Sequence, residues 1–407
     1  MSGHRQASGF SDLPDYLRLR KRLEQVRKLG VEVPFGRLSE GAAHSTVTIG
    51  GREYLNFSNY DYLDLSTHPA VVQAAKDAID RYGTSVSASR LVSGERPIHR
   101  ELEREIADLL ATEDCLVFVS GYLANLTTIG HLYGPRDLLA HDALIHNSAV
   151  HGCTHSRARR LIFPHNDWQT LDRMLSENRD RHGRALILIE GLYSMDGDYP
   201  DLPRFLEVKR RHNAELMIDE AHSLGVLGER GYGIREHFGV AAEDVDIWMG
   251  TLSKALASCG GYISGSRELI EYLRLSAPGF VYSVGIPPAA AAAALASLRI
   301  LKAEPWRVET LRARGRLFRE CARARGLNTG SSRGLNVAPV ITGSSLAAVR
   351  MSNAMFDEGV CVYPIIAPVA EEQSARLRFF LSCAHTEDQI SHTVNLVALH
   401  WDRIRVS

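Results

Sequence analysis

Short apolar runs alternate with amphipathic helical patterns along most of this chain, and this alternation constrains its fold more than any other feature. The clearest runs cover residues 115–119, 185–189, 215–218 and 245–249. Helical patterns at residues 97–111 and 202–212 adjoin runs of this kind. Runs that are apolar throughout are typical of strands buried on both faces. The chain is therefore predicted to be an α/β protein with a mainly parallel central sheet and helices on both faces.

The N-terminal end predicts an arm that leads into this α/β region. Leu17, Leu23 and Leu29 stand among charged residues in the segment 14–29. This spacing indicates an amphipathic helix. We expect residues 1–50 to form a helical arm rather than a domain.

The rest of the chain is expected to form two domains, a large α/β domain over residues 51–290 and a smaller α+β domain over residues 291–407. An Ala-rich helix predicted for residues 288–302 links them, and Pro287-Pro288 supplies its start. In the smaller domain, strands are expected at residues 337–341 and 376–381 and helices at residues 346–358 and 387–401.

Charge and composition exclude several classes of protein. The 47 Lys and Arg residues balance 48 Asp and Glu residues, so the electrostatic footprint of a general nucleic-acid binder is missing. The most apolar long stretch, residues 281–298, is rich in alanine and contains two prolines, so no membrane span is expected. The N-terminus lacks the apolar core of a signal peptide. Six scattered cysteines without a CxxC pair favour reduced thiols in the cytoplasm, with no disulfide frame or metal site.

Chemically rich residues follow three of the predicted strands, at the edge where open α/β sheets bind ligands. Gly121-Tyr122 opens a helix whose free N–H groups can hold a phosphate. Asp219 ends another strand, with His222 three residues further on, and Lys254 follows the last. Taken singly, these features are equally consistent with a turn, a charged loop and a surface lysine. Together they supply the phosphate site, pyridinium acid and imine-forming lysine of a pyridoxal-phosphate enzyme. No GxGxxG or GxxxxGK[ST] motif supports a dinucleotide or nucleoside triphosphate site.

The chain also resembles a known family over nearly its whole length, from about residue 56 to about residue 401. The matching segments are residues 83–94, 120–125, 163–167, 190–198, 219–225, 250–255, 282–288, 375–378 and 384–386. They resemble the α-oxoamine synthases, which include aminooxononanoate synthase, 2-amino-3-ketobutyrate ligase, aminolaevulinate synthase and serine palmitoyltransferase. The resemblance implies a fold-type I pyridoxal-phosphate homodimer with its active site between subunits and domains. The implied reaction joins an amino acid to an acyl thioester, of coenzyme A or a carrier protein, and releases carbon dioxide and the thiol.

The resemblance also implies roles for residues around the cofactor. Lys254 would hold the cofactor as an imine and later take the α-proton, and Asp219 would keep the ring nitrogen protonated. His222 would approach the phenolic oxygen. The implied phosphate site consists of Gly121, Tyr122 and Thr251.

Two further positions match residues that face the cofactor or the substrate. His146 matches the histidine that stacks on the cofactor ring, with His141 and His151 as rival alignments. Ser194 matches a serine near the cofactor and the substrate carboxylate. Without the resemblance, these would be an ordinary loop histidine and a turn serine.

Arg378 matches the arginine that grips the amino-acid carboxylate, for which a bidentate guanidinium is suited. Arg376 shares its strand face and is the alternative.

Departures from the family pattern bear on the substrates. Tyr60 stands where several members have Asn and serine palmitoyltransferases tend to have Tyr. Ile366 and Val369 replace an arginine and a threonine of aminooxononanoate synthase, which disfavours a pimeloyl-type substrate. Ser89 stands where glycine-restricted members have Thr, which favours alanine or serine over glycine. Asp64 replaces the usual Gly.

Two other functions are weighed against the synthase. The first is a fold-type I aminotransferase-like enzyme, which would share Asp219 and Lys254 but transfer no acyl group. The second is a non-catalytic subunit of a heterodimer, and the presence of Lys254 argues against it.

Overall fold

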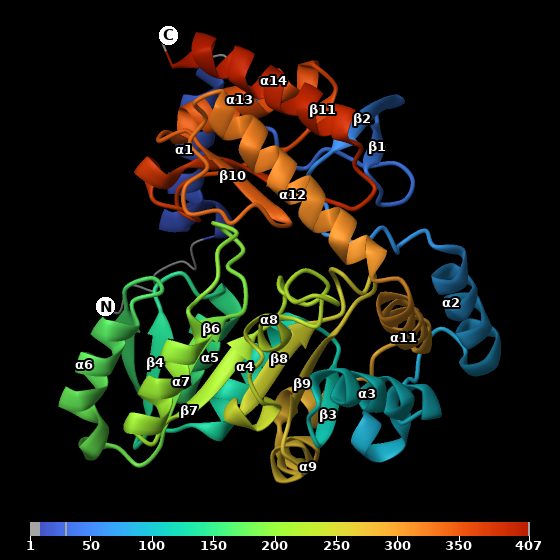
Figure 1. The fold of residues 1–407 in the computed structure, drawn as a ribbon, viewed down its shortest axis with the longest axis vertical. Helices are drawn as coiled ribbons and strands as arrows, with labels where there is room; N and C mark the ends of the chain where they lie inside the picture. Colours follow the sequence, from blue (N-terminus) through green and yellow to red (C-terminus); the bar gives the residue numbers. More distant parts are fainter. Residues whose placement is uncertain (1–8, 29–30, 406–407) are drawn as a thin grey trace, which may run out of the picture.

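A seven-stranded sheet forms the larger lobe of the computed structural model, which describes residues 9–28 and 31–405 (Figure 1). Its strands are β3 (Asp114–Phe118), β4 (Leu138–Asp142), β5 (Arg159–Phe163), β6 (Ala185–Glu190), β7 (Glu215–Asp219), β8 (Ile247–Thr251) and β9 (Gly261–Gly265). They lie in the order β3-β9-β8-β7-β6-β4-β5. β9 pairs antiparallel with β3 and β8, and all the other neighbours in this sheet are parallel. The predicted mainly parallel sheet is confirmed.

Both faces of this sheet are buried, as continuous apolar strands require. In β6, Leu186 and Leu188 pack into one apolar cluster and Ile187 and Ile189 into the other. The first face is covered by α4 (Gly121–Leu132), α5 (Asn147–Ser156), α9 (Arg267–Ser276) and α10 (Pro278–Val281). The second is covered by α3 (Pro97–Leu110), α6 (Trp168–Asn178), α7 (Leu202–Arg211) and α11 (Pro288–Ala303). Two further helices of this lobe are α2 (Pro69–Tyr82), which packs on α11, and the short α8 (Ile234–Phe238).

The smaller lobe contains the four predicted C-terminal elements, together with α12 and β12, which the sequence did not indicate. Its antiparallel sheet has the order β10-β13-β12, and α12, α13 and α14 accompany it (Figure 1). Their bounds are β10 (Val337–Ile341), β12 (Tyr363–Ile365), β13 (Arg376–Phe380), α12 (Trp306–Ala324), α13 (Ser345–Asp357) and α14 (Glu387–Ile404). No helix within the described residues is long and apolar enough to cross a membrane.

A third sheet ties the N-terminal segment to this smaller lobe. The hairpin of β1 (Thr46–Ile49) and β2 (Arg52–Asn56) pairs through β2 with β11 (Val360–Cys361). The predicted boundary at residues 50–51 falls in the turn of this hairpin.

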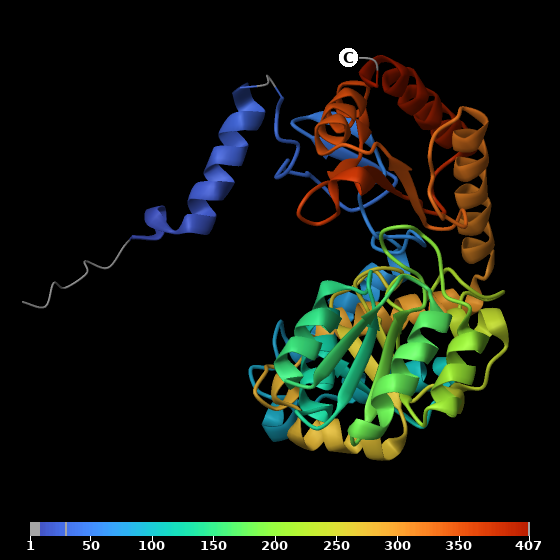
Figure 2. The ribbon, with the colours of Figure 1, turned by 90° about the vertical axis from the view of Figure 1, so that its left-hand side faces the viewer.

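The predicted arm contains a helix, α1 (Pro14–Lys28), which stands away from both lobes (Figure 2). Its Leu17 is exposed. Residues 1–8 and 29–30 of the predicted arm, including Leu29, lie outside the described residues.

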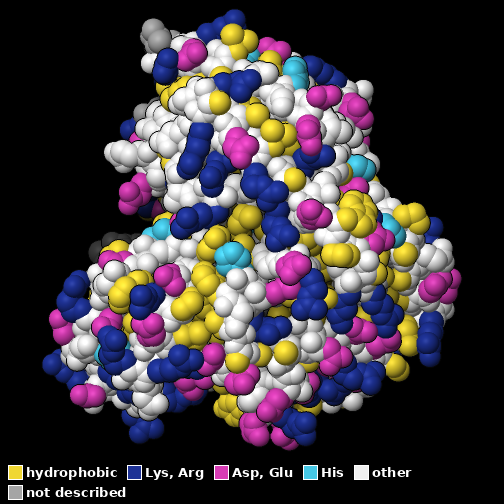
Figure 3. All heavy atoms as spheres, in the orientation of Figure 1, with side chains coloured by type: hydrophobic (Ala, Val, Ile, Leu, Met, Phe, Trp, Pro, Cys, Tyr) yellow, Lys and Arg dark blue, Asp and Glu magenta, His cyan; other side chains and the backbone are white. Residues whose placement is uncertain are grey.

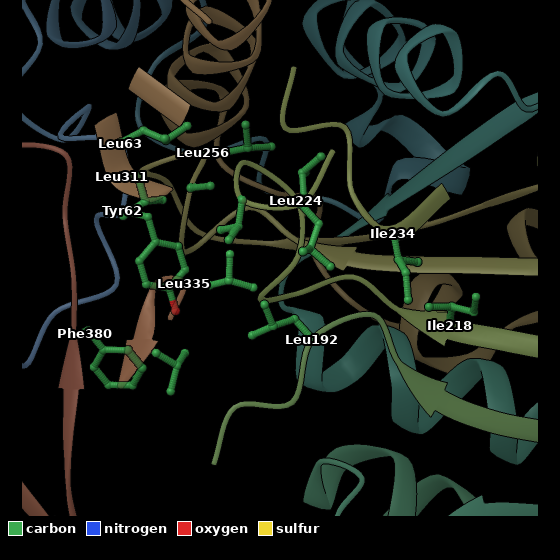
Figure 4. Close-up of a cluster of buried hydrophobic side chains, with 14 of the residues drawn as sticks. Tyr62, Leu63, Leu192, Ile218, Leu224, Ile234, Leu256, Leu311, Leu335 and Phe380 are labelled. Atoms are coloured by element: carbon green, nitrogen blue, oxygen red, sulfur yellow. The ribbon is translucent and has the colours of Figure 1, made fainter. Parts of the chain in front are cut away.

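The apolar core continues across the junction of the two lobes. Figure 4 shows Leu311 and Phe380 of the smaller lobe in the same buried cluster as Leu192, Leu224 and Ile234 of the larger one. Burial of this kind favours a fixed arrangement of the lobes. It holds β13 near the carboxyl ends of the large sheet.

Candidate active site

Polar side chains gather where neighbouring strands of the large sheet end. Asp142, Glu190, Asp219 and Thr251 lie at or beside the carboxyl ends of β4, β6, β7 and β8, and all four are buried. In the register of the sheet, Glu190 is directly beside Asp219. Burial, reinforced by the negative charge of Asp219, raises the pKa of Glu190 well above its ordinary value.

Asp219 is held by hydrogen bonds on both of its carboxylate oxygens. Oδ1 accepts from the backbone N–H of Ala221 at 2.9 Å, and Oδ2 accepts from Asn125 Nδ2 at 2.8 Å. The orientation of the side chain is therefore fixed by the protein itself, as its predicted role as pyridinium partner would require.

Lys254 is partly buried in the same region, beside the ring of Tyr60, whose centroid lies 5.9 Å from Nζ. Burial lowers the pKa of Lys254, and the positive charge of Arg378 adds to this, although Asp219 and Glu190 oppose it. The lysine thus loses proton affinity, which matches the sequence-based expectation. A deprotonated amine is the form that reacts with a carbonyl group.

His222 is buried at the loop that follows β7. Its Nδ1 lies 2.7 Å from the hydroxyl of Tyr62, and Asn336 Nδ2 donates to its backbone carbonyl at 3.1 Å. Burial lowers the pKa of His222 well below its ordinary value, and Lys254 and Arg378 add to the effect. The ring is therefore a neutral hydrogen-bonding group near Lys254.

Of the three candidate histidines, His146 is the one that interacts electrostatically with Asp219, Lys254 and Arg378. It caps the N-terminus of α5, and Glu190 Oε1 accepts from its backbone N–H at 2.6 Å. His141 is buried within β4, with Nδ1 bonded to the carbonyl of Asp142.

His151, the third of these histidines, bonds the hydroxyl of Tyr122.

The predicted phosphate-binding turn opens α4. The backbone N–H groups of Gly121 and Tyr122 have no acceptor within the described residues, because Ser120, the N-cap, bonds Leu123. A Cβ on Gly261 would lie 2.4 Å from the Cα of Gly121, so the close approach of β9 to this turn requires glycine. Free N–H groups at a helix N-terminus form an anion-binding site.

Thr251 lies next to this turn. A Cβ built on Gly121 would lie 3.2 Å from the hydroxyl oxygen of Thr251. That hydroxyl donates to the carbonyl of Gly260 at 2.9 Å and lies 2.7 Å from the hydroxyl of Ser253.

Arg378 reaches from β13 toward the loop that follows β6. Its Nη1 donates to the carbonyl of Ser194 at 3.1 Å, and its buried Nε has no hydrogen-bond partner within the described part of the chain. Arg376, by contrast, is paired with Asp196 at 2.6 Å. The structure thus distinguishes the two arginines by their partners.

A cavity of about 1130 Å³ opens between the lobes. Its walls include His146, Ser194, Arg376, Arg378 and Val369. On the face of the two lobes that Figure 3 shows, positive and negative side chains are interspersed.

Ser89 makes no hydrogen bond to the site residues described above within the described part of the chain. Its carbonyl accepts from the N–H groups of Val92 and Gly94, within its own loop. Its hydroxyl is buried without a hydrogen-bond partner among the described residues.

The sequence did not indicate four further residues as part of the site, namely Asn125, Glu190, Tyr62 and His165. Asn125 and Glu190 lie in segments that carry the family resemblance, and Glu190 also ends a predicted strand, which was an available signal. His165 bridges Asp142 at 3.0 Å and Asp198 at 3.1 Å, a contact that no local pattern indicates. Within the described residues, no group of three or more His, Cys, Asp or Glu side chains is placed to hold a metal ion.

Comparison with protein families and curated proteins gives consistent matches. A family model described as aminotransferase class I and II matches residues 52–397. The 8-amino-7-oxononanoate synthase of Geobacter sulfurreducens is 39% identical over 378 residues, which cover 92% of this chain and 96% of that protein. The enzyme of the same name from Thermoanaerobacter pseudethanolicus is 35% identical over 381 residues, 94% of this chain and 96% of the relative.

Comparison with solved structures identifies the same overall fold. A serine palmitoyltransferase from S. paucimobilis with bound PLP and myriocin superposes with a TM-score of 0.93 at 27% sequence identity. The match covers 97% of this chain and 100% of that one. The smaller C-terminal lobe is therefore included in the match.

Proposed function

Because the chain belongs to the aminotransferase class I and II family and, within it, to the α-oxoamine synthases, we propose that it condenses an amino acid bearing a side chain with an acyl thioester. The products are an α-amino ketone, carbon dioxide and a free thiol. The observation that supports this most directly is Lys254, a partly buried amine of lowered pKa near Asp219 and Arg378.

The residues present fit pyridoxal phosphate as the cofactor. Asp219 is oriented to accept from a ring nitrogen, and the free N–H groups of Gly121 and Tyr122, with Thr251 beside them, suit a phosphate. Lys254 provides the amine for covalent attachment. When bound, the cofactor supplies an electron sink for negative charge that develops at the α-carbon of the substrate.

The chain's own residues would bind the amino acid and move its protons. The free Nε of Arg378 is a donor for the substrate carboxylate, and Ser194 lies beside it. Lys254, once released from the cofactor, is a base of suitable pKa for the α-proton. His146, on the cavity wall, and the buried His222 are neutral groups that would orient the reactants.

The acyl thioester is proposed to enter through the cavity between the lobes. Val369 lines this cavity, and Ile366 lies in the same loop. Two apolar side chains here offer no partner to a terminal carboxylate, which disfavours a pimeloyl-type chain. The thioester is one of coenzyme A or of an acyl carrier protein.

The assembly and location of the enzyme are also proposals. A homodimer would place the active site between subunits, and the exposed apolar residues of α1, such as Leu17 and Leu19, are compatible with burial in an assembly. The six unpaired cysteines favour a cytoplasmic location.

A substrate screen tests the reaction. The cofactor-loaded enzyme is incubated with single amino acids and acyl thioesters, and thiol release and product mass are measured, with Lys254→Ala as the control. We expect thiol release that requires both substrates and a product that has lost carbon dioxide. Conversion of the amino acid to a keto acid without thiol release would instead identify the aminotransferase-like alternative.

A further inference from the structure

A chain of directed hydrogen bonds joins Asp219 to the ring of His146 through Asn125 and Ser148. Asn125 Nδ2 lies 2.8 Å from Asp219 Oδ2 and 2.9 Å from Ser148 Oγ. Ser148 Oγ lies 2.7 Å from His146 Nδ1. Asn125 and Ser148 are each only 1% exposed, so water does not compete for these contacts.

The orientation of the Asn125 amide follows from its contact with Asp219. A carboxylate accepts hydrogen bonds, so the NH₂ group of Asn125 must face it. The amide turned the other way would place two oxygen atoms within 2.8 Å of each other. The second N–H of the same NH₂ group then donates to Ser148 Oγ.

The direction of the next bond follows from the acceptor role of Ser148. Because its Oγ accepts from Asn125, its own proton is free to point at His146 Nδ1. The backbone N–H of Ser148 donates to the same nitrogen at 3.3 Å. Two donors to Nδ1 require a lone pair on that atom, so the ring proton lies on Nε2. Nε2 itself has no partner within the described residues, and His146 lines the cavity.

We propose that Asn125 and Ser148 are positioning residues that hold His146 as the neutral Nε2–H tautomer and leave this N–H free to donate to a bound substrate. Asp219 thereby orients His146 as well as meeting the cofactor. The use of the Nε2–H by a substrate rests on the proposed function, whereas the tautomer does not. Burial lowers the pKa of His146, and Lys254 and Arg378 lower it further against the opposing charge of Asp219, which agrees with a neutral ring.

The surroundings of His146 allow this proposal to be tested at Ser148 alone. The ionisable groups that face His146 are Asp219, Glu190, Lys254, His222, Arg378 and, edge-on to the ring, Tyr122. Ser148→Ala leaves all of them in place. It removes the hydroxyl that accepts from Asn125 and donates to the neutral ring, and loss of a donor to the neutral ring raises a histidine pKa.

The test is nitrogen NMR of the cofactor-loaded enzyme labelled with ¹⁵N-histidine, with His146 assigned by the signal that His146→Gln removes. At neutral pH, we expect a protonated Nε2 and an unprotonated Nδ1. Ser148→Ala should raise the pKa of His146 by roughly half to one unit. Ser148→Thr, which keeps the hydroxyl, should restore it, and Asn125→Ala should cause a smaller rise.

A buried serine at the other end of α5 provides the matched control. Ser156 Oγ donates to the carbonyl of Cys153 at 2.7 Å, and Ser156→Ala should leave the His146 signals unchanged. A protonated Nδ1 in the unmodified enzyme, or an unchanged pKa in Ser148→Ala, would overturn the proposal. If Asn125→Ala left the pKa and the nitrogen signals of His146 unchanged, the proposal that Asp219 helps to orient His146 would be overturned. Failure to turn over any thioester would instead refute the proposed function and leave these NMR results unaffected.

Discussion

Arg376 forms an ion pair with Asp196, in which Nη1 lies 2.6 Å from Oδ1. The same nitrogen donates to the carbonyl of Met195 at 3.0 Å. Arg378, two residues further along β13, donates to the neighbouring carbonyl of Ser194 and pairs with no carboxylate within the described residues. A partly buried guanidinium whose Nε has no partner is energetically costly without an anion. An incoming carboxylate would offset this cost, which favours Arg378 over Arg376 as the proposed carboxylate-binding residue.

Replacement of Arg378 should therefore weaken binding of the amino acid. Arg378→Lys keeps the charge but loses the bidentate fork, and we expect KM for the amino acid to rise roughly 10- to 100-fold. Steady-state kinetics at saturating thioester measure this. Arg376→Lys is the control, because it should lower the thermal stability and change KM less. An equal rise of KM in both variants would contradict the assignment.

Lys254→Ala should abolish covalent attachment of the cofactor. Borohydride treatment of the unmodified enzyme should trap the cofactor on the peptide that contains Lys254, as detected by mass spectrometry. The variant should show no such adduct and no turnover above background. A trapped cofactor on another lysine, or full turnover in the variant, would show that the lysine is wrongly assigned.

Asp219→Asn should retain the cofactor but lose most of its rate. A neutral amide does not keep the ring nitrogen protonated, and we expect kcat to fall roughly 100-fold or more. Bound cofactor is measured by absorbance after release. Near-normal turnover with full occupancy would refute the role of Asp219 as the pyridinium partner.

The sequence predicted β3, β6, β7 and, with a shift of two residues, β8, because these strands are apolar and buried on both faces. It did not indicate β4, β5 or β9, which carry polar, charged or glycine residues. Leu186 to Ile189 are all apolar, so no alternation was needed to recognise β6. The positions of Asp219 and Lys254 after such runs also placed them on one edge of the sheet. These predictions depended only on local patterns and on the rule for parallel strands.

Contacts between distant segments could not be predicted in the same way. The pairing of β2 with β11 joins Leu55 to Val360, and the His165 bridge joins loops after β5 and β6. Nothing in either local sequence specifies its partner. Asp64 is explained only by its backbone, whose φ of 55° lies in the left-handed region that favours glycine and tolerates Asp.

The stability of the protein should fall at alkaline pH through His165. Burial lowers the pKa of His165, but Asp142 and Asp198 outweigh it and raise the pKa to about 10. Because the pKa is raised in the folded state, protonated His165 contributes to the unfolding free energy. This contribution is complete below the unfolded-state pKa of about 6.5 and is lost as the pH rises through about 10. The unfolding free energy of the unmodified enzyme should therefore exceed that of His165→Asn at pH 6, and the difference should shrink toward pH 10. A difference that does not vary with pH would contradict this assignment.

The last prediction concerns the choice of amino acid at Ser89. Its hydroxyl is buried without a partner among the described residues, and its carbonyl is bonded within its own loop. Ser89→Thr adds one methyl group, and a group of this size in a pocket is worth roughly 1–3 kcal/mol of discrimination. We expect the unmodified enzyme to use alanine or serine at least as well as glycine, and the variant to shift kcat/KM toward glycine by roughly 10-fold. Ser85→Thr, an exposed change in the same loop, is the matched control and should leave the preference unaltered. Glycine as the sole substrate of the unmodified enzyme would refute the prediction, because a pocket that already excludes a side chain gains nothing from a further methyl group.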